Sequence, residues 1–240
     1  MGIKASARNL LDNSDFTNPV NQRNITNVSV ASSTKYFIDR WLIYGNGASF
    51  NISSKKMIIT NDGSATCGLL QRISAEALTV GKTYTLATKA KVTGEQWYLS
   101  YGITAGNNAD SSSALSGDIE KVHIFTFTLP ESENNIYNFR IRCSSAVGTA
   151  EIEWIALYEG EYTVDTLPKY IPRSYQEELN TCMRYYQYYD RFDTSGYITT
   201  SATDYVIPIN LPVPMRVRPT ATISKIVGRC SSGGYSKWAV

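Results

Sequence analysis

The sequence predicts a mainly β protein: a jelly-roll β-sandwich, followed by a short helix and a small C-terminal β domain. Two observations predict this fold class. Between residues 9 and 160, apolar and polar residues alternate in segments of roughly four to eight residues, separated by clusters of Gly, Asn and Ser. No long helical pattern interrupts these segments, and about eight successive strands are typical of two packed sheets.

Four segments show the clearest alternation and give the order of the expected strands. Residues 82–92 place Tyr84, Leu86 and Val92 on one face and polar residues on the other. The same pattern recurs over residues 97–103, 125–129 and 137–143. Turn residues lie between the strands, at positions 46–47, 61–63, 93–94 and 106–113.

The pattern changes after residue 160. Two prolines predict an extended linker over residues 163–173. Ser174 then suits a helix N-cap, and Glu177 completes a capping box, so we expect a helix over residues 174–187. Its apolar positions recur at helical spacing, at Tyr175, Leu179, Cys182, Met183 and Tyr186.

We therefore divide the chain into a sandwich of residues 1–162, a linker of residues 163–173, and a third part of residues 174–240. Four prolines keep the strands expected after the helix short or at sheet edges, at Pro208, Pro212, Pro214 and Pro219. Residues 194–240 are too few to bury a stable core by themselves. We expect the third part to be incomplete, or completed by association with other copies of the chain.

The composition argues against several classes of function. Charged residues make up only 18% of the 240 residues, and 23 basic against 21 acidic residues give a net charge of +2. Without a basic cluster, a nucleic-acid partner is not expected, and no apolar run is long enough to insert into a membrane. The four cysteines and one histidine do not form a zinc-binding pattern. We expect Cys143 and Cys182 to be buried free thiols.

Three groups of residues, taken as an ordered set, resemble a known family. The first is Asn-Leu-Leu-x-Asn-x-x-Phe at residues 9–16 with Asn-Gln-Arg at 21–23, and the second is Ile-Asp-Arg-Trp at 38–41. The third is the succession of residues 152–160, 166–170 and 182–186. This set resembles the tail-fibre and tail-tip (receptor-binding) proteins of phages and prophages that infect Gram-positive bacteria, which contain a jelly-roll domain like that of carbohydrate-binding modules.

The resemblance implies a function in host recognition. It implies a component of the phage tail, located in the virion and made in the cytoplasm of the host bacterium. Its expected partners are bacterial cell-surface polysaccharide, other phage tail proteins and further copies of itself, as a homotrimer. A purely architectural virion protein is the main alternative. A glycan-degrading enzyme is a third possibility, but no pair of facing acids predicts one, so we expect a non-enzymatic protein.

Candidate glycan-binding residues are Tyr98, Arg140, Arg142 and Trp41. If strand 97–103 lies beside strand 137–143, then Tyr98, Arg140 and Arg142 share one outward face, where arginine offers planar donors to sugar hydroxyls or phosphate. A solvated face without a ligand is the alternative. Trp41 either stacks on a sugar or fills the sandwich, and its place inside a framework motif favours the second interpretation.

The resemblance also implies a structural calcium ion, as in many jelly-roll carbohydrate modules, and no other cofactor. The nearest oxygen donors are Asp12, Asp15 and Glu153, and calcium requires six or more oxygens. Thr17 stands where the family usually has an acidic residue. His123 alternates with two phenylalanines, so we expect a hydrogen-bonded strand histidine rather than a general base.

Overall fold

The computed structural model describes residues 7–30, 33–103, 111–132, 134–190, 197–198, 205–206, 208–222, 226–229 and 235–238. The chain forms two compact units, Met1–Asp193 and Thr194–Val240. The helix α1 (Tyr175–Met183) belongs to the first unit together with the sandwich. The division therefore falls later in the chain than the expected linker. Independent folding of residues 1–162 stays a prediction.

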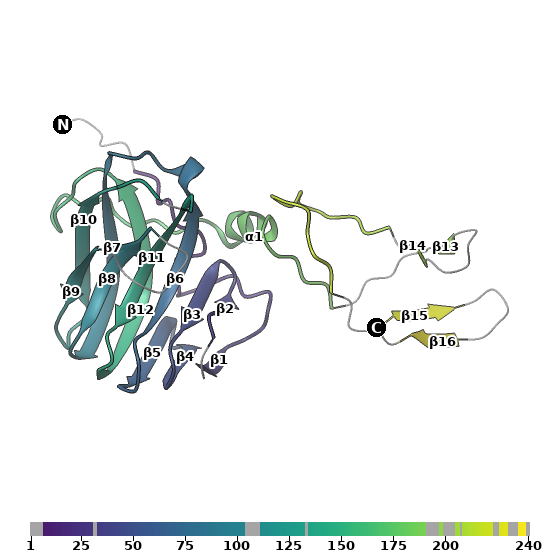
Figure 1. Cartoon of the computed structure of the whole chain (residues 1–240), viewed down its shortest axis with the longest axis horizontal. Coiled ribbons are helices and arrows are strands. Elements are labelled where there is room, and N and C mark those ends of the chain that lie inside the picture. Colours follow the sequence, from purple (N-terminus) through teal and green to yellow (C-terminus); the bar gives the residue numbers. More distant parts are fainter. Residues whose placement is uncertain are drawn as a thin grey trace. The chain divides into compact units, whose positions relative to one another are not determined.

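Two six-stranded antiparallel sheets form the sandwich (Figure 1). Sheet A has the order β1 (Asn27–Val30), β4 (Ala48–Ser53), β5 (Lys56–Asp62), β12 (Val147–Glu159), β7 (Thr83–Gly94) and β10 (Lys121–Thr128). Sheet B has the order β2 (Lys35–Ile38), β3 (Trp41–Tyr44), β6 (Cys67–Ser74), β11 (Ile136–Cys143), β8 (Trp97–Gly102) and β9 (Ser111–Leu115). A 3-10 turn, η1 (Ala75–Ala77), follows β6. The predicted fold class, a mainly β sandwich with a short helix, is confirmed.

The predicted alternation decides which side chains fill the space between the sheets. Sheet B contributes the inward, almost completely buried side chains of Trp97, Leu99, Phe139, Ile141 and Cys143. Sheet A contributes those of Tyr84, Leu86, Phe125 and Phe127. The rings of Tyr101 and Phe127 meet across the core with centroids 4.5 Å apart. Burial of such large apolar groups is the main stabilising contribution to the fold.

One expected turn is partly wrong. The polar segment 106–113 overlaps β9, in which Ser111 pairs with Tyr101 of β8. Small polar residues therefore form an edge strand here. Residues 106–110 lie outside the described part of the chain.

The N-terminal segment 9–16 continues sheet A along the second half of β12. β5 pairs with β12 only as far as Ile152, where a β-bulge shifts the register. Beyond this point, the Leu10 amide donates to the Leu157 carbonyl at 2.9 Å. The Asn9 side chain accepts a hydrogen bond from the Leu157 amide, also at 2.9 Å. Segment 9–16 thus lies beside the second half of β12, where β5 no longer pairs with it.

The β-bulge also turns Trp154 away from the space between the sheets. Trp154 is buried on the outer face of sheet A, where its ring stacks on Tyr170 with centroids 4.6 Å apart and planes 5° apart. Tyr158 and Leu167 pack in the same cluster. Trp154 is thus buried in a second hydrophobic cluster, which lies outside the space between the two sheets. Segment 163–173, expected as a linker, lies against sheet A here and covers this cluster.

The helix begins as the sequence predicts. The Ser174 hydroxyl accepts from the Glu177 amide, and the Glu177 carboxylate accepts from the Ser174 amide, which completes the capping box. α1 ends at Met183, one turn short of the expected end. Cys182 is a buried free thiol, as predicted, but Tyr175 is 47% exposed, so the first position of the apolar stripe does not pack.

The described residues of the second unit include two short hairpins. β13 (Tyr197–Ile198) pairs with β14 (Tyr205–Val206), and β15 (Ile226–Arg229) pairs with β16 (Tyr235–Trp238). The described residues 208–222 form no strand, although alternation predicted strands there, because their prolines remove backbone donors. Cys230 lies outside the described residues. Where the structure describes the chain, it contains no helix long and apolar enough to cross a membrane.

Candidate functional site

The outer face of sheet B, the side away from the core, presents tyrosine, arginine and serine in two registered rows. One row crosses β3, β6, β11 and β8 through Tyr44, Gly68, Arg142 and Tyr98. The next row crosses β6, β11 and β8 through Leu70, Arg140 and Ser100. Side chains two residues apart on a strand share a face. The pairing of β8 with β11 therefore brings Tyr98, Arg140 and Arg142 to one face, as expected.

Arg142 and Tyr98 form a contact pair at facing positions. The Arg142 guanidinium carbon lies 5.1 Å from the centroid of the Tyr98 ring, within the range of a cation–π interaction. Arg142 Nη1 also donates to the Ser144 hydroxyl at 2.9 Å. Both long side chains are half-buried, so the pair is held in position before any ligand arrives.

Arg140 and Tyr44 lie deeper in the same face. Arg140 is fully buried and Tyr44 is 2% exposed. A Cβ atom at Gly68 would stand 2.7 Å from the Tyr44 hydroxyl, so only glycine lets this ring lie across β6. Burial raises the pKa of Tyr44, against the opposing effect of the positive charges of Arg140 and Arg142. Tyr44 therefore remains a neutral phenol that can both donate and accept.

Two buried polar atoms on this face lack a partner. Ser100 Oγ and Arg142 Nε have no hydrogen bond to any residue that the structure describes. Buried polar atoms are normally paired, and each one left unpaired costs about 1–3 kcal/mol. The outer face of sheet B thus has hydrogen-bonding capacity that the described protein does not use.

The outer face of sheet A differs. Its charges pair with one another: Lys56 with Glu120 at 2.6 Å, and Lys89 with Glu153 at 2.5 Å. The part of that face formed by β7, β10 and the second half of β12 is covered by the cluster around Trp154. Of the two faces, sheet B is therefore the better place for a ligand.

Trp41 occupies the core. It is fully buried, its ring packs edge-on against Phe16 with centroids 5.4 Å apart, and its Nε1 donates to the Asn13 carbonyl at 2.7 Å. The ring cannot stack on a sugar in this position. Trp41 fills the sandwich, which was the favoured interpretation of its motif.

The acids proposed for calcium have other partners. Asp12 pairs with Arg40 and with Arg173, both at 3.1 Å. Asp15 Oδ1 accepts from a nearby backbone amide, and Glu153 pairs with a lysine. Within the described ranges, no three His, Cys, Asp or Glu side chains are grouped so that they could hold a metal ion. This set of donors does not fit the expected calcium site.

The motif residues instead connect the N-terminal segment to α1. The Glu178 carboxylate accepts from the Asn13 amide and pairs with Arg173 at 3.2 Å. Burial raises the pKa of Glu178, while the hydrogen bond from Asn13 and the charge of Arg173 oppose the rise. Arg40 lies 3.6 Å from the centroid of the Tyr185 ring. These contacts give the recognised motifs a structural role, the docking of the helix on the sandwich.

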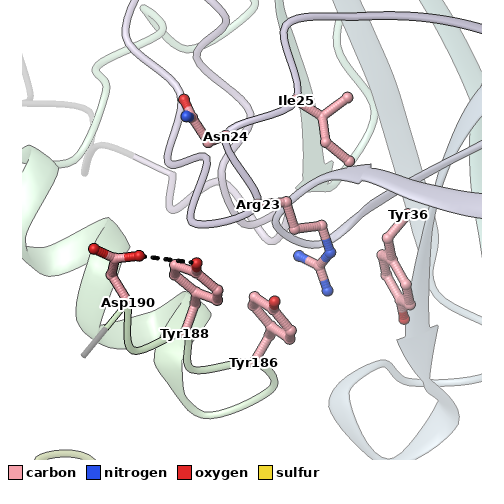
Figure 2. A pocket seen from close by; sticks show the side chains of 7 residues that line it. All are labelled: Arg23, Asn24, Ile25, Tyr36, Tyr186, Tyr188 and Asp190. Atoms are coloured by element: carbon pink, nitrogen blue, oxygen red, sulfur yellow. Dashed lines mark hydrogen bonds between the residues drawn. The ribbon is translucent and has the colours of Figure 1, made fainter. Parts of the chain in front are cut away.

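A separate pocket of about 970 Å³ lies beside β2 (Figure 2). Its walls come from the N-terminal turn (Arg23, Asn24 and Ile25), from Tyr36 of β2, and from the segment after α1 (Tyr186, Tyr188 and Asp190). The Arg23 guanidinium carbon lies 3.7 Å from the centroid of Tyr186 and 4.9 Å from that of Tyr36. No local sequence pattern predicts this pocket, because the residues of its walls are far apart in the chain.

Tyr44 and Ser100 on sheet B were also missed. Ser100 follows Tyr98 by two positions, so strict alternation places it on the same face. Tyr44 ends the four-residue run of β3, in which every residue is buried. Alternation of polarity gives no signal in such a run.

No protein-family model and no curated protein matches the chain. Solved structures are more informative about similarity. A family 4 carbohydrate-binding module is 18% identical with a TM-score of 0.43, over 51% of this chain and 88% of its own. The second N-terminal cellulose-binding domain of Cellulomonas fimi β-1,4-glucanase C is 15% identical with a TM-score of 0.42, over 67% of this chain and 100% of its own.

A phage protein is also among the similar structures. The enzymatically active domain of tailspike protein 4 from bacteriophage CBA120 is 16% identical with a TM-score of 0.42. The match covers 62% of this chain but only 23% of the tailspike chain. Because these identities and TM-scores are low, we infer function from this chain's own residues.

Proposed function

We propose that this protein is a non-enzymatic phage tail component that binds bacterial cell-surface polysaccharide through the outer face of sheet B. One observation supports the choice of face above the others. Tyr98 and Arg142 are partly exposed there at facing positions, with the Arg142 guanidinium carbon 5.1 Å from the centroid of the Tyr98 ring. An accessible ring beside a guanidinium offers a polysaccharide both a stacking surface and planar hydrogen-bond donors.

The chemistry of the face suits a sugar chain. Tyr98 supplies an aromatic plane for the apolar side of a pyranose, and the adjacent Arg142 supplies planar donors for hydroxyl, carboxylate or phosphate oxygens. The contact between these two side chains fixes their orientation before binding. A preorganised site loses less conformational entropy when the ligand binds.

The tail assignment rests on the ordered motifs of residues 9–23, 38–41 and 152–186. It places the protein in the virion, in contact with other tail proteins and assembled as a homotrimer. Three copies multiply weak sugar contacts by avidity. Light scattering on the full chain tests the trimer, and a stable monomer at micromolar concentration would contradict it.

The main competing function is purely architectural, with no glycan bound. It predicts that no surface substitution changes adsorption to cell walls. An enzyme would release reducing sugar or phosphate from the same walls. Release would overturn the non-enzymatic proposal and leave the binding face to be tested separately.

The decisive experiment measures binding of the full chain to purified wall polysaccharide from a panel of Gram-positive bacteria. Arg142→Gln and Tyr98→Ala are expected to weaken binding about tenfold or more, because each removes a charge-assisted or aromatic contact. Lys91→Gln, on the outer face of sheet A, is the matched control and should bind normally. Arg140 is unsuitable, since its complete burial couples binding to stability. Equal binding by all variants would refute the proposed face.

A further inference from the structure

The pocket beside β2 differs in character from the outer face of sheet B. Tyr36 and Tyr188 are 43% and 55% exposed, so two aromatic rings of its wall are open to solvent. Figure 2 shows the rings of Tyr36 and Tyr186 on either side of the Arg23 side chain. Its volume of about 970 Å³ lies within the usual range for small-ligand sites, about 300–1,000 Å³.

The charge of Arg23 is already balanced. Its Nη1 contacts the Asp39 carboxylate at 2.5 Å, and the Asp39 side chain is 1% exposed. The Gln22 amide donates to the other Asp39 oxygen at 2.7 Å. Arg23 is therefore a fixed part of the wall, held between two rings and anchored from behind, and not a mobile cation available to an anion.

The remaining polar groups suit hydroxyls. Asn24 of the N-terminal turn and Asp190 of the segment after α1 also line the pocket, and the Tyr188 hydroxyl donates to Asp190 Oδ1 at 3.5 Å. Asp190 gives the pocket a negative charge beyond the balanced Arg23–Asp39 pair, which disfavours phosphate or carboxylate ligands. Neutral hydroxyl groups can accept from Asn24 and donate to Asp190.

We propose that this pocket is a second saccharide site, which takes a short neutral pyranoside. The sugar stacks its apolar face on Tyr188 and directs its hydroxyls to Asn24 and Asp190. The proposal rests on the proposed function for the ligand class, carbohydrate, but it concerns different residues.

The two sites are too far apart for one sugar unit. Tyr36 lies on β2 and Tyr98 on β8, and sheet B places β3, β6 and β11 between these strands. Four interstrand spacings correspond to about 19 Å. A single pyranose therefore occupies one site only, and substitutions at the two sites have separable effects.

Saturation-transfer NMR on the full chain tests the pocket, with the methyl glycosides of glucose, galactose, N-acetylglucosamine and rhamnose as probes. We expect at least one neutral glycoside to receive saturation at its ring protons. Tyr188→Ala should reduce that signal about tenfold, because it removes the exposed stacking surface and leaves the Arg23 contacts in place. Asp190→Asn should weaken binding without abolishing the stacking signal.

Two controls separate this proposal from the preceding one. Tyr175→Ala removes an exposed tyrosine on α1 outside the pocket, and Tyr98→Ala alters the outer face of sheet B. Tyr175→Ala should keep the whole glycoside signal, and Tyr98→Ala should keep the part of the signal that Tyr188→Ala removes. Three results would each overturn the pocket proposal. The first is a glycoside signal that is lost in Tyr98→Ala but kept in Tyr188→Ala. The others are displacement of the glycoside by inorganic phosphate and the absence of signal from every probe. Binding to wall polysaccharide through Arg142 is measured independently, so either proposal can fail alone.

Discussion

Replacing Tyr170 with Ala removes the ring that covers Trp154 on the outer face of sheet A. The two rings are parallel within 5°, and such a stack contributes about 1 kcal/mol. Uncovering about 100 Å² of apolar surface costs about 2.5 kcal/mol more at about 25 cal/mol per Å². We therefore expect Tyr170→Ala to lower the free energy of unfolding by about 3.5 kcal/mol, and Tm by roughly 7–14 °C.

Urea unfolding followed by tryptophan fluorescence measures this change directly, because Trp154 is itself a reporter. Tyr175→Ala is the matched control, since that tyrosine is 47% exposed and its loss should change stability by less than about 0.5 kcal/mol. Segment 163–173 is docked on sheet A through this ring. If Tyr170→Ala is as stable as the control, the segment is an undocked linker, and a chain of residues 1–162 should then fold by itself.

Two further predictions concern the sandwich. Gly68→Ala should lower the free energy of unfolding by about 1–3 kcal/mol. The reason is that its new Cβ would stand 2.7 Å from both the Ile141 carbonyl and the Tyr44 hydroxyl. Unchanged urea unfolding would contradict this prediction and show that Tyr44 can move aside. Burial, followed by the charge of Lys121, lowers the pKa of His123 below its usual value of 6.5. As pH falls, His123 therefore takes up a proton in the unfolded chain before it does so in the folded protein. The free energy of unfolding should decline from about pH 6.5 down to the pKa of His123 in the folded protein. His123→Asn should lack this part of the decline in melting scans between pH 7 and 5, and identical pH profiles would contradict the prediction.

Local patterns correctly predicted two strands and the start of the helix. The alternation at residues 97–103 and 137–143 identified β8 and β11, because period two is a property of each strand by itself. The capping box at Ser174 and Glu177 identified the start of α1 for the same reason. Each of these features depends on residues within a few positions of one another.

Features that depend on distant partners were not predictable in this way. Trp154 faces outward because a bulge shifts β12 against β7, and alternation alone places it in the core. Asp12 was considered as a calcium ligand, but Arg40 and Arg173 occupy its oxygens. The burial of Arg140 depends likewise on what packs over sheet B, which the polarity of its own strand does not reveal.

The residues that carry the family resemblance and the residues of the proposed glycan site have different physical tasks. Asn9, Asn13 and Trp41 complete backbone hydrogen bonds and fill the core at one end of the sandwich. Tyr98 and Arg142 occupy outward positions, where neither sheet pairing nor core packing fixes the side chain. The motifs therefore identify the scaffold and say little about the ligand of the proposed site. Exchanging the outward side chains should change the ligand while the fold, held by the other set, stays the same.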